Sequence, residues 1–146
     1  MNIKNYTSGV PASTSISHIE EYLINYGASD ISKKYDENKI CKSITFRIIV
    51  NSIPTFFQIT VNTEACFKVI RSNRVRPTSA TDITDRKQSE RTAWKIVSDW
   101  VEIQISMVIM NQIDLIQAFL ANVYNPATEK TFYTSIKDNG FKQLGN

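Results

Sequence analysis

The stretch AWKIVSDWVEIQISMVIM, residues 93–110, constrains the fold more than any other part of the chain. Its polar residues are spaced by three, one, three and four positions, so on a helix they form one narrow stripe. They are Lys95, Ser98, Asp99, Glu102 and Ser106. A helix that is otherwise apolar or neutral packs on several sides. We therefore expect a long helix, beginning near Thr84 or Asp85, that forms the spine of the domain with its polar stripe facing solvent.

The two tryptophans of this stretch fall on different sides of the predicted helix. Trp94 and Trp100 are six residues apart, which corresponds to about 240° around a helix. We expect both indoles to pack in the core, in different layers, with each N–H group finding one acceptor.

The first half of the chain predicts a shorter helix and a small antiparallel sheet. Four apolar residues recur at spacings of three, four and three, as on one helical face: Ile16, Ile19, Leu23 and Tyr26. Gly27 is placed to end this helix, because glycine enters the left-handed conformation at little cost. From Ile40 the apolar residues alternate, so residues 40–50 and 55–62 predict a hairpin, and residues 28–35 predict a third strand.

The remaining segments complete a single α+β domain over residues 1–146. Residues 63–71 suit a short helix capped by Thr63. Residues 72–85 contain Pro77 and little apolar material, so we predict that they form a flexible loop, and we expect residues 1–13 to be flexible as well. Beyond the long helix, apolar residues at helical spacing predict further C-terminal helices, the first running to Val123.

Composition is typical of one globular domain. The chain has 146 residues, of which 42% are hydrophobic and 21% charged. No apolar leader is evident, and the longest apolar-rich run, residues 100–110, is shorter than the roughly 20 residues of a membrane span. The two cysteines, Cys41 and Cys66, indicate no disulfide framework and are expected to be buried thiols. We expect a soluble, cytoplasmic protein with no membrane partner, and a homo-oligomer is left open.

Residues for catalysis are scarce. The chain has one histidine, His18, and two cysteines, which is too few for a zinc site of nitrogen and sulfur ligands. His18 has no identifiable partner for nucleophilic catalysis, and we expect it to face solvent. Four glycines and no phosphate-loop motif leave little material for a nucleotide-binding loop. We therefore expect no cofactor, no bound metal and no catalytic residue.

Carboxylates are the remaining candidates for a catalytic or metal-binding site. Asp99 and Glu102 are three residues apart on the polar stripe, and together with Asp114 they can hold a hard metal ion. However, Lys95 precedes Asp99 by four residues and is placed to pair with it. A metal-dependent hydrolase using Asp99 and Glu102 is therefore kept only as a third alternative.

The positive charge of the chain is concentrated between residues 67 and 95. This segment has eight basic and three acidic residues, a net charge of +5, and the rest of the chain carries −2. Such asymmetry bears on partners rather than on fold: it fits contact with phosphates, and it also fits a solvated loop followed by an ordinary charged helix start. The candidate phosphate contacts are Arg71, Arg74, Arg76, Arg86, Lys87, Arg91 and Lys95. Aromatic residues are not interleaved with them, which argues against stacking of single-stranded bases in this region.

The motifs Ala93-Trp94-Lys95-Ile96-Val97 and Asp99-Trp100-Val101-Glu102, followed by Gln104, resemble those of a family of small proteins from bacteriophages and prophages. The first helix ending at Gly27-Ala28 and the predicted hairpin also fit this family, over most of residues 14–145. Lys95 stands where the family pattern has arginine. The resemblance implies a phage or mobile-element setting, and it implies no catalytic residues because the family has no established activity.

The predicted function is that of a non-enzymatic, nucleic-acid-associated protein of phage or mobile-element DNA metabolism. Residues 71–95 would contact phosphates, with DNA or RNA as the partner. The alternative is a protein-binding module that uses apolar surface between residues 100 and 124, for instance to inhibit a host enzyme or defence complex.

Overall fold

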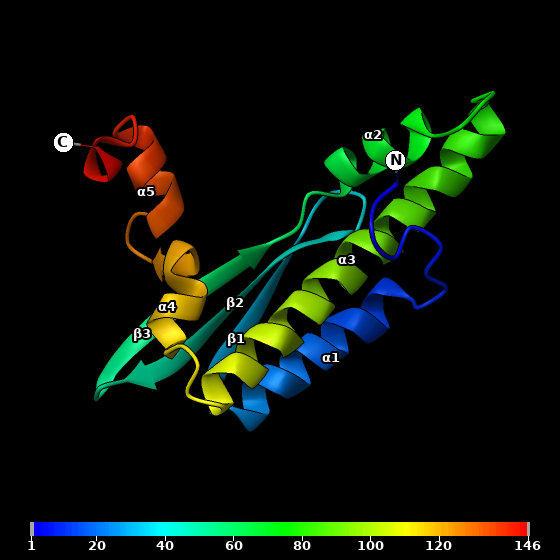
Figure 1. The fold of residues 1–146 in the computed structure, drawn as a ribbon. Helices are drawn as coiled ribbons and strands as arrows, with labels where there is room; N and C mark the ends of the chain where they lie inside the picture. Colours follow the sequence, from blue (N-terminus) through cyan, green and yellow to red (C-terminus); the bar gives the residue numbers. More distant parts are fainter. Residues whose placement is uncertain (1, 146) are drawn as a thin grey trace.

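The computed structural model describes residues 2–145, which form helices and one antiparallel sheet, so the α+β class is confirmed (Figure 1). The α-helices are α1 (Ala12–Asn25), α2 (Thr63–Ser72), α3 (Ser79–Ile109), α4 (Leu115–Phe119) and α5 (Phe132–Asp138). Short 3₁₀ helices follow at η1 (Leu120–Asn122) and η2 (Lys142–Leu144). The strands are β1 (Ser29–Tyr35), β2 (Cys41–Val50), β3 (Ile53–Thr60), β4 (Val123–Asn125) and β5 (Lys130–Thr131).

The sheet has five strands in the order β1-β2-β3-β4-β5, so the prediction of about three strands was too low. The added strands, β4 and β5, have three and two residues and show no alternation that a sequence pattern can reveal. Val123 was predicted to end a helix, but it pairs with Phe57, while Tyr124 pairs with Phe56. The open edge of β3 offers unpaired backbone groups at this point, and valine and tyrosine favour the extended conformation.

A two-residue turn sets the register of the central hairpin. Asn51 and Ser52 have φ angles of 49° and 69°, as in the left-handed turns whose twist matches that of paired strands. Val50 therefore pairs with Ile53, and alternate residues of β2 face opposite sides of the sheet. Ile44, Phe46 and Ile48 are buried, whereas the residues between them are more exposed.

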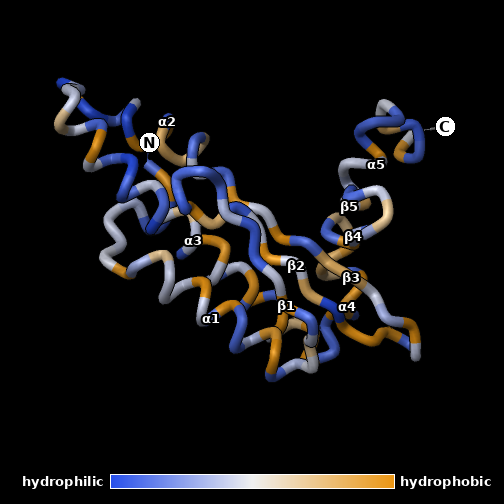
Figure 2. Tube along the Cα trace, turned by 180° about the vertical axis from the view of Figure 1, so that it is seen from behind, coloured by the Kyte–Doolittle hydropathy of each residue, from blue (hydrophilic) through white to orange (hydrophobic). Residues whose placement is uncertain are grey.

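Helices α1 and α3 lie side by side on one face of the sheet, and α2 lies near the start of α3 (Figure 1). Figure 2 looks onto the opposite face of β1–β3, with α5 standing apart from the main body. Four aromatic side chains close the core between sheet, α3 and α4. Phe46 stacks on Phe57 with ring centroids 5.3 Å apart, and Phe119 meets the edges of Phe57 and Trp100 at 6.2 and 5.4 Å.

The predicted long helix is confirmed as the spine, and its tryptophans point into different layers. Trp94 is fully buried, and its indole N–H donates a hydrogen bond to the Cys41 carbonyl at 3.2 Å. Trp100 packs instead against Phe119 on α4.

The prediction that the polar stripe of α3 faces solvent is wrong in part. Residues 2–11 pack over some of it. The Asn5 side chain donates to Asp99 Oδ2 at 2.9 Å, while the Thr92 hydroxyl donates to the Asn5 carbonyl at 2.8 Å. Ser98 is buried as well. A segment distant in sequence supplies these contacts, so the periodicity of α3 alone could not reveal them.

Two helices begin at other residues than predicted. Helix α3 starts at Ser79, because the Thr78 hydroxyl accepts from Thr81 N–H and the Thr81 hydroxyl accepts from Thr78 N–H in a capping box. The predicted loop over residues 72–85 is therefore reduced to residues 73–78. Helix α2 is capped by Asn62, whose side chain accepts from Ala65 N–H, and not by Thr63.

The predicted end of α1 is confirmed: Gly27 has a φ angle of 109°, and Ala28 N–H donates to the Leu23 carbonyl at 2.9 Å. None of the helices formed within residues 2–145 combines the length and apolar character that crossing a membrane requires.

Candidate nucleic-acid interface

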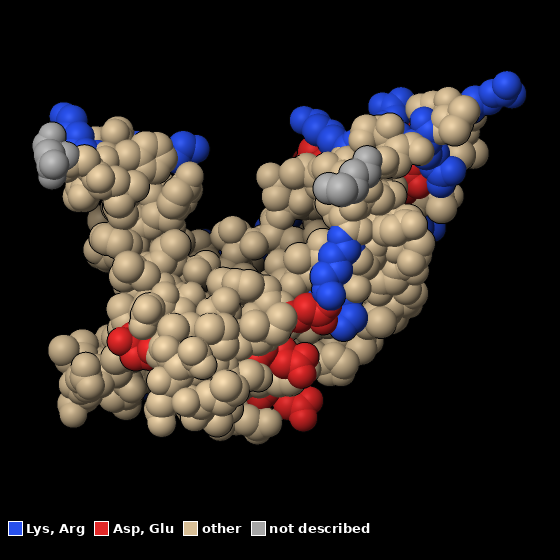
Figure 3. Space-filling model, viewed as in Figure 1, with Lys and Arg blue, Asp and Glu red and all other residues tan. Residues whose placement is uncertain are grey.

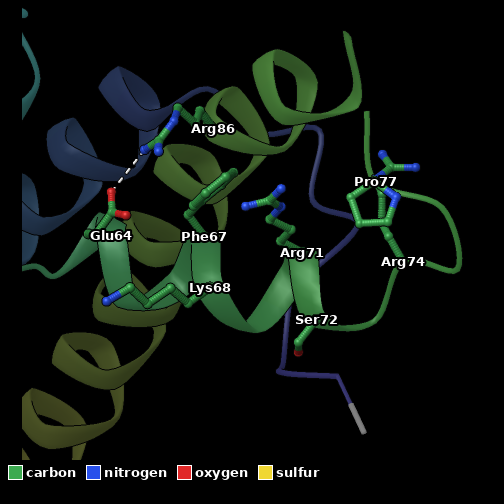
Figure 4. A pocket seen from close by; sticks show the side chains of 8 residues that line it. All are labelled: Glu64, Phe67, Lys68, Arg71, Ser72, Arg74, Pro77 and Arg86. Carbon is green, nitrogen blue, oxygen red and sulfur yellow. Dashed lines mark hydrogen bonds and ion pairs between the residues drawn. The ribbon is translucent and has the colours of Figure 1, made fainter. Parts of the chain in front are cut away.

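An open hollow of about 510 Å³ lies between α2 and the start of α3, and we call it the α2–α3 hollow. It is lined by Glu64, Phe67, Lys68, Arg71, Ser72, Arg74, Pro77 and Arg86. Figure 4 shows these side chains extending from α2, from α3 and from the loop that joins them. Three of the seven predicted phosphate contacts, Arg71, Arg74 and Arg86, therefore meet at one place, together with Lys68.

Each of these arginines is held by a carboxylate. Arg71 pairs with Asp82 at 3.1 Å, Arg74 with Asp85 at 2.7 Å, and Arg86 with Glu64 at 2.8 Å. The ion pairs reduce the local excess of positive charge, but the hydrogen bonds within two of them also hold the guanidinium groups of Arg74 and Arg86 in defined positions. Exposed pairs of this kind contribute little stability, so an incoming phosphate can compete for the arginine.

Arg86 is positioned by a second contact. Its guanidinium carbon lies 3.9 Å above the centroid of the Phe67 ring, as in a cation–π interaction. The hydrogen bond from Arg86 lowers the pKa of Glu64, so this carboxylate remains charged well below neutral pH.

The pair of Arg74 and Asp85 differs from the other two because the carboxylate is buried. Asp85 is only 2% exposed, and it accepts two hydrogen bonds, from Nε and Nη2 of Arg74, at 2.7 and 2.8 Å. These hydrogen bonds lower the pKa of Asp85 despite its burial. Arg74 thus anchors the loop between α2 and α3 in addition to lining the α2–α3 hollow.

The other predicted contacts are spread around α3. Lys87 and Arg91 line a second hollow of about 520 Å³ beside residues 7–13, which we call the N-terminal hollow. Arg76 is exposed on the loop before α3. Lys95 pairs with Asp99 at 2.7 Å in the middle of the helix, and this hydrogen bond raises the pKa of Lys95. The seven residues therefore do not line a single hollow.

Charge nevertheless remains uneven over the molecule. Figure 3 shows Lys and Arg gathered at the end formed by α2 and the start of α3, with a smaller group on the C-terminal arm around α5. Most Asp and Glu visible on this face lie over the other half of the main body. The α2–α3 end is thus the larger basic region of the visible surface.

An aromatic residue from outside the basic segment, Tyr6, lies in the same region. Tyr6 lines a third hollow of about 420 Å³ together with Arg74, Thr7 and Gln88, and we call it the Tyr6 hollow. Tyr6 is far from Arg74 in the sequence, and no local pattern links the two. Only the packing of residues 2–11 on α3 brings them together.

The geometry gives little support to a metal-dependent hydrolase that uses Asp99 and Glu102. Both oxygens of Asp99 are engaged, one by Lys95 and one by Asn5, and these hydrogen bonds lower the Asp99 pKa against the effect of burial. Within residues 2–145, no group of three His, Cys, Asp or Glu side chains is arranged to hold a metal ion.

The predicted burial of the two cysteines and the predicted exposure of His18 are confirmed. Cys41 and Cys66 are buried thiols, and burial raises the pKa of both. His18 is exposed on α1 beside Tyr22.

No protein-family model, no curated protein and no solved structure matches this chain. Geometry and charge are therefore the basis for assigning a function.

Proposed function

We propose that this protein is non-enzymatic and binds nucleic acid through the α2–α3 end of the molecule. The observation that supports this most directly is the convergence of Lys68, Arg71, Arg74 and Arg86 on one open hollow. A setting in phage or mobile-element DNA metabolism follows from the resemblance of residues 93–104 and belongs to the same proposal.

Phosphate binding at this end is favoured by both charge and pre-organisation. Arginine recognises phosphate through its planar fork of N–H donors, and lysine acts as a point charge. Neutralising phosphates releases counterions from the nucleic acid, so the affinity should fall steeply as salt rises. Arg86 is already oriented by its hydrogen bond to Glu64 and by the Phe67 ring, which lessens the ordering that binding requires.

The proposal is tested by reversing two exposed charges that form no ion pair among residues 2–145, in the variant Lys68→Glu/Arg76→Glu. Two lost phosphate contacts and two new repulsions should weaken binding to a labelled oligonucleotide at least tenfold at low salt. The plot of log K against log salt should become shallower by about two units. Fluorescence anisotropy across a salt series measures both quantities.

The matched control is Lys137→Glu/Lys142→Glu, which makes the same change in net charge on the C-terminal arm. It should bind far more tightly than Lys68→Glu/Arg76→Glu. Equal losses in the two variants would show that only net charge matters, and undetectable binding of the unmodified protein at low salt would refute the proposal.

A protein-binding module remains the second candidate function, because apolar side chains are exposed near the end of α3. Ile103 and Met110 are 56% and 68% exposed, and their spacing of seven residues places them on one stripe of the helix. We infer that these side chains belong to an apolar interaction patch, because large exposed apolar patches mark such sites.

If the second function is correct, the tagged protein should recover a stoichiometric protein complex that survives nuclease treatment, or form a homo-oligomer seen by light scattering. The double variant Ile103→Lys/Met110→Lys should abolish that complex or homo-oligomer. Ile53→Lys provides the control, since Ile53 is an isoleucine that is 65% exposed at the tip of the β2–β3 hairpin. A complex that survives Ile103→Lys/Met110→Lys would contradict this second function.

A further inference from the structure

Shared lining residues link the Tyr6 hollow to each of the other two hollows around the start of α3. Arg74 lines both the α2–α3 hollow and the Tyr6 hollow. Thr7 and Gln88 line both the Tyr6 hollow and the N-terminal hollow, where Lys87 and Arg91 lie. We call this series of hollows the track: its basic residues are Arg71 and Arg86 in the first hollow, Arg74 beside Tyr6 in the second, and Lys87 and Arg91 in the third.

Tyr6 is the exposed aromatic side chain in the middle of this track. It is 46% exposed, and it makes no ring–ring or cation–ring contact within residues 2–145. The segment that carries it is tied to α3, because the Thr92 hydroxyl and the Gln88 amide donate to the carbonyls of Asn5 and Ser8. The ring is thus presented on a fixed segment and is available to a ligand.

Arg74 supplies an oriented donor next to this ring. Its Nε and Nη2 atoms are engaged by Asp85, which fixes the plane of the guanidinium group. Nη1 makes no hydrogen bond among the described residues and remains available to a phosphate. In the N-terminal hollow, which shares Thr7 and Gln88 with the Tyr6 hollow, Lys87 is exposed and forms no ion pair within residues 2–145.

An aromatic platform between cationic groups suits a particular form of nucleic acid. Bases in a single strand have free faces that stack on aromatic side chains, whereas bases in a duplex are already stacked on each other. Each hollow is large enough for a ligand of nucleotide size, with volumes of about 510, 420 and 520 Å³.

We propose that the track binds single-stranded nucleic acid, with one base stacked on Tyr6 and the flanking phosphates bound by Arg74 and Lys87. This inference rests on the proposed function and deepens it by naming the form of the ligand. It also reverses the sequence-based expectation that stacking is absent, because the aromatic residue comes from outside residues 67–95.

The test compares Tyr6→Ala, Tyr6→Leu and Tyr6→Phe in anisotropy titrations with labelled oligothymidine and with a duplex of the same length. The unmodified protein should prefer the single strand. Tyr6→Ala and Tyr6→Leu should each weaken single-strand binding roughly tenfold, within the range known for base–aromatic stacking. Tyr6→Phe should bind like the unmodified protein, because phenylalanine keeps the ring. None of the three variants should change duplex binding or the dependence of affinity on salt, since no phosphate contact is removed.

An abasic oligonucleotide gives the decisive control, because it keeps the phosphates and lacks the bases. The unmodified protein and Tyr6→Ala should bind it equally. Equal single-strand affinity of Tyr6→Ala and the unmodified protein would overturn the stacking inference, as would an equal loss on the abasic strand. If binding still depends on Lys68 and Arg76 in that case, the proposed function stands without the inference. Failure of every oligonucleotide to bind would overturn both.

Discussion

Trp94→Ala is expected to lower the free energy of unfolding by about 3–5 kcal/mol, the usual cost of truncating a large buried aromatic residue. Trp94 is fully buried where α3 packs on β2, and its indole donates to the Cys41 carbonyl. The substitution therefore leaves a cavity and also removes the donor to a buried carbonyl. Because a domain of this size is only marginally stable, this is a large part of its total stability.

Urea unfolding followed by circular dichroism measures this effect. Trp94→Phe should be less destabilising, because it keeps much of the apolar volume while losing the hydrogen bond. Ile103→Ala is the control on the same helix, and its exposed position should keep the change within about 0.5 kcal/mol. A loss below about 1 kcal/mol in Trp94→Ala would show that α3 does not pack on the sheet as described.

Arg74→Met is expected to cause the second large effect, a fall of several degrees in the melting temperature at pH 7. Asp85 is buried and ionised in the native protein, and Arg74 supplies both of its side-chain hydrogen bonds. Without Arg74 this carboxylate is left buried without its partner, or must take up a proton. Asp85→Leu should restore much of the lost stability in the double variant Arg74→Met/Asp85→Leu, because it removes the buried charge.

The pH dependence of stability provides an independent check on this pair. The hydrogen bonds from Arg74 lower the pKa of Asp85 in the folded protein, whereas an aspartate in the unfolded chain has a pKa of about 3.9. The pair therefore stabilises the fold fully above the unfolded pKa, and this contribution is lost as pH falls through the lower folded pKa. In Arg74→Met the folded pKa is no longer lowered, so its melting temperature should converge on that of the unmodified protein as the pH is reduced. A difference that stays constant down to acidic pH would contradict the pairing.

The dual role of Arg74 affects how the proposed interface is tested. Because Arg74 holds the loop between α2 and α3 through Asp85, its replacement changes stability and binding together. Lys68 and Arg76 are exposed and hold no buried carboxylate, so reversing them changes the surface charge alone. A loss of affinity in Lys68→Glu/Arg76→Glu can then be attributed to the proposed nucleic-acid contact.

Local patterns predicted much of the fold correctly. Helix α1, the β2–β3 hairpin and the spine helix follow from apolar periodicity, and Gly27 ends α1 as expected. The errors arose where the local pattern was weak or had an unfamiliar form. The capping box at Thr78 uses Thr81 in place of a glutamate or glutamine, and β4 is too short to alternate.

The candidate site was predicted less completely than the fold. The cluster of basic residues between 67 and 95 was evident from composition, but their separation into different hollows was not. Helix α3 divides them, since Arg86 faces the α2–α3 hollow while Lys87 and Arg91 line the N-terminal hollow. Lys95 forms an ion pair with Asp99, as the spacing of four residues between them predicted.

Spacing and composition along the chain are enough to predict the α+β class, the position of the spine helix and the concentration of positive charge before and within it. These properties depend on neighbouring residues, whose spacing sets which helix face or strand face they share. The burial of Asp85, the five-stranded sheet and the placement of Tyr6 beside Arg74 become evident only in the folded domain. Each of these depends on contacts between segments distant along the chain, and the packing of the whole domain determines which of those segments meet.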